Sequence, residues 1–148
     1  MSTIHPVQHT SDTVTAYFDE DTRILRIAYH GVMSPAVTAE FYQWLGSVIK
    51  QYPAKVVTAR GSIYDFRAVT EFANSNISST QRQSQHVNQQ VDLQDHPVAI
   101  IAKDALQTAL LSATMKITGQ QDRKRIVRNE QEAVSFIEAF HRQREPSS

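Results

Sequence analysis

The five consecutive apolar residues from Val98 to Ala102, between Pro97 and Lys103, constrain the fold more than any other stretch of this sequence. A strand that is apolar at every position has to be covered on both of its faces. Such coverage is typical of a parallel sheet with helices packed against it. The stretch therefore predicts a central strand of a mainly parallel sheet.

Strand patterns and helix patterns alternate along the rest of the chain. An opening hairpin is predicted at 13–18 and 22–30, where β-branched and aromatic residues are common. The predicted elements follow in the order β-β-α-β-α-β-α-β-α. This order predicts an α/β fold with a single domain, whose mainly parallel sheet is opened by the antiparallel hairpin.

Several predicted elements begin or end at residues with a clear local role. Ser34 can cap a helix whose first residue is Pro35, where the missing N–H costs nothing. That helix should end at Pro53, and the strand after it should end at Phe66. Asp104 can cap the helix that follows the apolar strand.

The domain boundaries follow from where core-forming residues are scarce. We expect residues 1–11 to be a flexible N-terminus, residues 12–141 to form the domain, and residues 142–148 to be a polar tail. A chain of 148 residues needs only one core. Within the domain, the polar residues 74–94 predict a helix with few apolar anchors.

The composition excludes several kinds of site. Fifteen Lys and Arg balance fifteen Asp and Glu, so no net charge attracts nucleic acid. The chain has no Cys, which removes thiolate zinc sites and fits a reducing compartment. Six His without metal-ligand spacing and four Gly without a nucleotide loop predict no metal and no cofactor. The lack of a signal peptide or spanning segment favours a cytoplasmic location.

Charged and polar side chains follow the predicted parallel strands at their carboxyl ends. Open α/β sheets commonly bind ligands beyond these ends, where helix N-termini also lie. We therefore predict a rim that meets a ligand or partner, and its residues are His30, Asp65, Arg67, Lys103, Asp104, Arg128 and Asn129.

Two interpretations of Asp65 and Arg67 stay open. Both side chains would lie on the same side of a strand, and we favour a structural ion pair or an anchored turn. The alternative is a small enzyme that uses Asp65, Arg67 and Glu71. Nothing in the sequence fixes the separation that acid and base roles require.

The helix after Asp104 has more apolar residues than one buried face needs. Core packing is the first explanation of the excess. A groove for an acyl chain, a dimer surface or a membrane-facing patch is the second. The candidate apolar groove consists of Leu106, Leu110, Leu111 and Met115.

One cluster of basic residues lies near the last predicted strand of the chain. A solvated edge strand guarded by charges is favoured over a site for a phosphate or a lipid head group. The residues are Arg123, Lys124, Arg125 and Arg128.

Three stretches of the sequence resemble one known family. They are IYDFRAV at the end of a strand, VAIIAKDALQTALL across a strand and a helix, and RIVRNEQEAVSFIEAF near the C-terminus. With the order of elements, they resemble the STAS superfamily, and most closely its SpoIIAA-like bacterial branch, over about residues 13–140. The resemblance implies a cytoplasmic, non-enzymatic module that acts by binding.

The same resemblance implies a position for a regulatory phosphate. Anti-sigma-factor antagonists of this branch are switched by phosphorylation of a Ser in a turn that follows a strand. Residues 73–76 fall at the position of that turn, and only Ser75 of its residues is retained. A phosphate would add about −1.5 to −2 charges to a surface that faces a partner. For the nearby Ser78 and Ser79 we favour a role as helix caps.

The leading hypothesis from the sequence is a non-catalytic binding or regulatory module that forms a homodimer. It would recognise a protein partner or an apolar lipid ligand, with peripheral membrane contact as a related expectation. A partner switch phosphorylated near Ser75 is the alternative, and the small enzyme is the second alternative.

Overall fold

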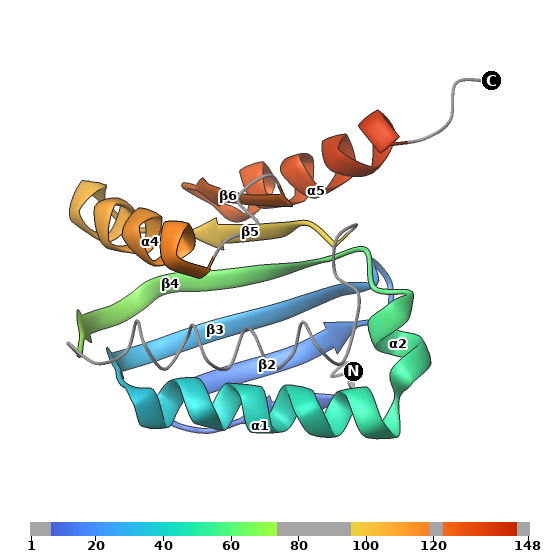
Figure 1. Ribbon diagram of the computed structural model, residues 1–148, viewed down its shortest axis with the longest axis horizontal. Helices are drawn as coiled ribbons and strands as arrows, with labels where there is room; N and C mark the ends of the chain where they lie inside the picture. Colours follow the sequence, from blue (N-terminus) through green and yellow to red (C-terminus); the bar gives the residue numbers. More distant parts are fainter. Residues whose placement is uncertain (1–6, 74–95, 119–122, 145–148) are drawn as a thin grey trace, which may run out of the picture.

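The computed structural model describes residues 7–73, 96–118 and 123–144. Six strands form one sheet in the order β1-β2-β3-β4-β5-β6 (Figure 1). The strands are β1 (Gln8–Thr10), β2 (Val14–Asp19), β3 (Ile24–Met33), β4 (Gly61–Phe72), β5 (Val98–Ile101) and β6 (Lys124–Val127). The helices are α1 (Pro35–Gln51), α2 (Pro53–Val57), α4 (Ala105–Thr118) and α5 (Glu130–Arg144).

The strand directions confirm the predicted fold class. β1, β2 and β3 pair antiparallel, whereas β3, β4, β5 and β6 pair parallel. The chain is therefore a mixed α/β domain with a mainly parallel sheet that an antiparallel hairpin opens. Within the described residues, no helix is both long enough and apolar enough to cross a membrane.

The two faces of the sheet carry two separate cores. Leu25 packs in the cluster that contains Phe41 of α1, whereas its neighbour Ile24 packs in the cluster that contains Ile137 of α5. Successive side chains of a strand point to opposite faces, so the two helices cover opposite faces. Figure 1 shows that they also lie at different ends of the strand order, with α1 beside β2 and α5 beside β6.

The predicted start of α1 is confirmed in detail. Pro35 is its first residue, and the Ser34 side chain accepts a hydrogen bond from the backbone N–H of Val37 at 3.4 Å. The apolar stripe of the helix is buried at Val37, Phe41, Leu45 and Val48, as the helical spacing predicts. The sequence did not fix where the next strand begins: residues 53–57 form the short helix α2, and the strand begins at Gly61.

The N-terminal segment is more ordered than its sequence suggests. Residues 8–10 form β1, which pairs with β2, so the prediction of a flexible segment up to residue 11 was wrong for this part. Glu40 of α1 accepts hydrogen bonds from Ser11 Oγ at 2.5 Å, His9 Nε2 at 2.6 Å and Thr13 Oγ1 at 3.1 Å. These bonds, that from Ser11 most of all, lower the pKa of Glu40. At the other end, α5 continues through Arg144, beyond the expected start of the tail.

Strand β4 is longer than predicted, and β5 lies in a different place. β4 continues beyond Phe66 to Phe72, and it extends past the end of β5 in Figure 1. The apolar strand β5 was predicted to be central, but it is the fifth of six strands. The burial of β5 comes from β4 and β6 at its edges and from helices over the sheet, and this burial does not require a central position.

The close contact between β4 and α5 allows a stability prediction at Gly61. A Cβ atom there would lie 2.9 Å from Pro97 O and 3.1 Å from Ile137 Cδ1. We expect Gly61→Ala to lower the free energy of unfolding by about 1–3 kcal/mol, because overpacking forces the backbone to shift. Urea unfolding, followed by the fluorescence of Trp44, measures the change.

Gly46 provides the matched control for this substitution. It lies inside α1, and a Cβ there would meet nothing within 4 Å. Gly46→Ala should therefore stabilise the protein by about 0.5–1 kcal/mol, because alanine has the higher helix propensity. Equal effects of the two substitutions would contradict the close contact at Gly61.

Candidate functional site

The Asp65 and Arg67 pair lies at a bulge in β4. Ala28 of β3 pairs with Asp65, but His30 pairs with Ala68, so three steps along β4 match two along β3. The bulge leaves the backbone N–H of Arg67 available, and this group donates to Asp65 Oδ1 at 2.9 Å. The Asp65 side chain thus provides a hydrogen-bond acceptor for the backbone N–H that the bulge leaves without a strand partner.

The Arg67 guanidinium binds the same carboxylate. Its Nε donates to Oδ1 at 3.0 Å and its Nη2 donates to Oδ2 at 2.8 Å. Partial burial raises the pKa of Asp65, but the hydrogen bonds and charge of Arg67, with the charge of His30, outweigh it, and the net pKa is lowered. The hydrogen bonds described for Asp65 all come from Arg67. This arrangement agrees with the interpretation of the two residues as a structural ion pair and an anchored turn.

Asp65 and Glu71 are far apart along the same strand. With a rise of about 3.3 Å per residue, six residues separate them by roughly 15–20 Å after allowance for the bulges. Two carboxyl groups that act on one bond lie within about 10 Å of each other. The two carboxylates therefore do not form the acid and base pair of the enzyme hypothesis.

Lys103 and Asp104 lie where β5 ends, and a residue that the sequence did not indicate joins them. Asp104 Oδ1 accepts from the backbone N–H of Gln107 at 2.8 Å and caps α4, as predicted. The buried Gln107 side chain accepts from Lys103 N at 2.8 Å and donates to Phe66 O at 2.8 Å. Lys103 Nζ donates to Val69 O at 3.2 Å.

These contacts replace a strand. β5 pairs with β4 only up to Asp65, opposite Ile101, so among the residues that the structure describes β4 has no strand neighbour on that side from Phe66 onward. The side chains of Gln107 and Lys103 instead donate hydrogen bonds to the carbonyl groups of Phe66 and Val69. They close part of an edge that would otherwise be open to another strand.

The remaining rim residues lie at the start of α5 and in β3. Asn129 Oδ1 accepts from the backbone N–H of Glu132 at 2.9 Å, and Glu132 Oε2 accepts from Arg128 N at 3.2 Å. This reciprocal arrangement resembles a capping box, displaced by one residue at Arg128. His30 Nε2 lies 3.4 Å from Thr15 Oγ1 on β2. The rim thus consists of separate groups, each with its own local bonds.

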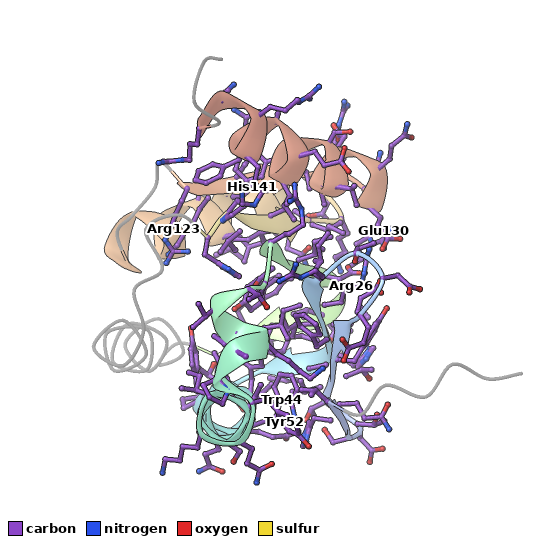
Figure 2. All side chains as sticks on the ribbon, turned by 90° about the vertical axis from the view of Figure 1, so that its right-hand side faces the viewer. Arg26, Trp44, Tyr52, Arg123, Glu130 and His141 are labelled. Atoms are coloured by element: carbon purple, nitrogen blue, oxygen red, sulfur yellow. The ribbon has the colours of Figure 1, made fainter. Side chains whose placement is uncertain are left out.

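An ion-pair network on the face of the sheet where α5 packs was not indicated by the sequence. Arg26 of β3 pairs with Asp19 at 3.3 Å and with Glu130 of α5. Figure 2 shows Arg26 and Glu130 together below the start of α5. Their separation of 104 positions in the sequence explains why no local pattern could reveal the pair. The network ties the hairpin to α5.

A second polar cluster lies at the amino ends of β4, β5 and β6. Ser62 Oγ is 2.7 Å from His96 Nε2, and Arg123 Nη1 donates to His96 O at 3.1 Å. Burial, and then the charges of Arg123 and His141, lower the pKa of His96 to about 4. Burial and Arg123 also lower the pKa of Lys124 to about 8. Arg123 is buried, so the prediction of a solvated basic edge was wrong for this residue.

The structure does not bring the candidate groove residues to one surface. Leu111 is buried at 4% exposure, whereas Leu106 is 72% and Leu110 is 41% exposed. The Met115 side chain, and all of Ser75, Ser78 and Ser79, lie outside the described residues. Among the residues that the structure describes, no group of three or more His, Asp or Glu could hold a metal ion.

The bulge at Asp65 leads to a second stability prediction. Asp65→Ala removes the acceptor of the Arg67 N–H, and we expect it to lower the free energy of unfolding by about 1–2 kcal/mol. Thermal and urea unfolding measure the loss. Thr70→Ala, at an exposed position of the same strand, is the control and should change stability by less than about 0.5 kcal/mol. An unchanged Asp65→Ala variant would contradict the role at the bulge.

Comparison with known proteins gives a clear result for structure alone. No protein-family model and no curated protein matches the sequence. A protein from Shewanella loihica with a SpoIIAA-like fold aligns at a TM-score of 0.55 and 11% identity, over 87% of this chain and 97% of that one.

Two anti-sigma factor antagonists have similar structures. The unphosphorylated form of SpoIIAA aligns at a TM-score of 0.52 and 10% identity, over 90% of this chain and all of that chain. An anti-sigma factor antagonist from Mycobacterium paratuberculosis aligns at 0.52 and 9% identity, over 87% of this chain and 97% of that one. At these identities the likeness concerns the fold. The chain has a SpoIIAA-like, STAS-type fold.

Proposed function

We propose that this chain is a non-catalytic module that binds a protein partner at the carboxyl rim of its sheet. The observation that carries the proposal is the use of the rim charges. Asp65, Lys103 and Asp104 bind neighbouring backbone groups, so they shape the surface instead of facing a reacting group. The similarity in fold to anti-sigma factor antagonists supports a role in protein binding.

The chemistry of the rim suits a polar protein surface. Arg67, Lys103, Asp104 and Arg128 are exposed, and they carry charges of both signs. Mixed charges favour specific orientation and fast encounter over tight apolar burial. A partner with complementary charges, bound in a contact that can be reversed, fits such a surface.

Capture and then titration of the partner tests this proposal. A tagged chain is used to isolate bound proteins from extracts of its source cells, and each candidate partner is then purified and titrated by calorimetry. We expect the double variant Glu71→Lys and Arg128→Glu to weaken binding at least about tenfold, because it reverses the exposed charge of Arg128 on the rim and that of Glu71 at the carboxyl end of β4. Lys50→Glu, at the end of α1, should leave binding unchanged. Equal affinity of the rim variant would contradict the proposal.

Finer features of the function remain predictions. The partner contact is expected in the cytoplasm of a bacterium, and the alternative of a switch near Ser75 is tested by incubation with cognate kinases and phosphosite mapping. No phosphate at residues 75–79 would end that alternative. A lipid ligand or peripheral membrane contact predicts extra mass in native mass spectrometry, which organic extraction removes.

The same proposal includes a homodimer. A second copy would double the number of rims in the particle and would increase the avidity for a partner with repeated sites. The state of association is measured by sedimentation over a series of protein concentrations.

A further inference from the structure

His30 of β3 lies against the bulge of β4. It pairs with Ala68, directly after the bulge, and its Nε2 atom is 3.4 Å from Thr15 Oγ1 on β2. The ring is only partly buried. A hydroxyl group can donate to a neutral ring nitrogen or accept from a protonated one. The contact with Thr15 is therefore compatible with both charge states of His30.

The charge of His30 is coupled to that of Asp65. Burial raises the pKa of Asp65, but the hydrogen bonds and charge of Arg67 lower it, and the charge of His30 lowers it further. Coupling between two sites is reciprocal, so the Asp65 carboxylate favours a proton on His30 by the same free energy. Histidine is the side chain whose charge ordinarily changes between about pH 5 and 8. The ion pair at the bulge therefore has a neighbour whose charge can respond to pH.

Two other elements lie beside this group of residues. On β2, the neighbour of His30 is the uncharged Thr15. On α5, Glu130 pairs with Arg26 of β3, and its charge also acts on Arg67. Glu130 is thus shared between two arginines, so the carboxylate of the bulge is the one that balances a proton on His30.

We propose that His30, Asp65 and Arg67 form a proton-operated switch, in which a proton on His30 adds the positive charge that binds an acidic side chain of the partner. The inference rests on the rim contact proposed above, and it names one partner group and its regulation. Asp65 and Arg67 balance each other, so a protonated His30 gives one carboxylate two cations. The Arg67 side chain is 48% exposed and that of Asp65 is 27% exposed, so the cation is the more accessible member of the pair.

NMR titration of the histidine side chains tests the switch in the full chain without a partner. The midpoint of the His30 titration should shift to lower pH in Asp65→Asn, whose amide oxygen can still accept the N–H of the bulge, and to higher pH in Arg67→Gln. His30→Gln assigns the resonance. The matched control is His9, which contacts Glu40 of α1 and whose titration should not move. A His30 midpoint that stays unchanged in Asp65→Asn would overturn the switch. If that variant does not fold, an unchanged midpoint in Arg67→Gln would do so.

Calorimetry with the purified partner then tests the acidic contact. The wild type should bind about threefold more tightly at about pH 6 than at about pH 8, as expected for one additional charge pair in solvent. His30→Gln should lose this difference, and Lys50→Glu should retain it. Equal pH dependence of the wild type and His30→Gln, or weaker binding by the wild type at the lower pH, would overturn the switch and leave the rim contact standing. A partner that ignores the rim variants at every pH would overturn the rim contact itself.

Discussion

The variant Gln107→Ala is expected to be among the least stable single substitutions of this chain, with a loss of about 2–5 kcal/mol in the free energy of unfolding. Gln107 is 3% exposed, and its amide joins Lys103 N to Phe66 O. The substitution would remove the partners of the part-buried Lys103 N–H and of the buried Phe66 carbonyl. Urea unfolding measures the loss of stability, and hydrogen exchange should show earlier opening of α4 and of β4 beyond Phe66.

Two further variants separate hydrogen bonding from helix propensity at this position. Gln107→Glu keeps the acceptor for Lys103 N but places a carboxylate oxygen against Phe66 O, so it should destabilise the protein as alanine does. Thr108→Ala, next to it on a more exposed position, loses only a bond to Asp104 O and should cost about 0.5 kcal/mol or less. If all three variants unfold like the wild type, the amide does not hold the edge of β4.

Gln107 also shows where hydrophobic periodicity predicts the wrong side of a helix. The helical spacing of the apolar residues places a buried stripe of α4 at Leu106, Ala109, Leu110, Ala113 and Ile117, but the first four of these are exposed. Gln107 is buried because its amide replaces the missing strand neighbour of β4, and a hydrophobicity pattern counts glutamine as a surface residue. Leu111 follows it one turn later on the same side.

Local signals predicted other parts of the fold well. The Ser34 cap and Pro35 determine the start of α1, and Asn129 with Glu132 determines the start of α5, because capping bonds join residues within one turn. The alternation of strand and helix patterns predicted the order of β2, β3, α1, β4, β5, α4, β6 and α5, whereas β1 and α2 were not predicted. The capping role of Asp104 was predictable for the same reason.

Contacts between residues that are far apart in the sequence could not be predicted from such local signals. β4 passes Phe66 because a bulge at Asp65 and Arg67 resets its register against β3, and a charged pair alone does not reveal a bulge. Strand β1 has the polar sequence QHT, and its order comes from pairing with β2 and from Glu40, about thirty residues away. The contact between Ser62 and His96 joins β4 to a residue two positions before β5, and no motif connects the two.

The Ser62 and His96 contact leads to the second large effect, which is a loss of stability in mild acid. The pKa of His96 is about 4 in the folded chain, below its ordinary value of 6.5. Between these values the unfolded state binds more protons, so the stability is complete above pH 6.5 and falls as the pH approaches 4. The difference in pKa corresponds to at most about 3 kcal/mol. Urea unfolding at a series of pH values measures it.

The groups around His96 explain why its pKa is lowered, and they suggest a control variant. Ser62 of β4, Arg123 before β6 and His141 of α5 face it, and the charges of Arg123 and His141 oppose a proton on the half-buried ring. His96→Gln can keep a hydrogen bond to Ser62 but does not titrate. Its stability should therefore change less than that of the wild type between pH 6.5 and 4.5, while the lowered pKa values of Glu40 and Asp65 affect both proteins alike. Parallel pH profiles for the two proteins would assign the acid sensitivity to other groups.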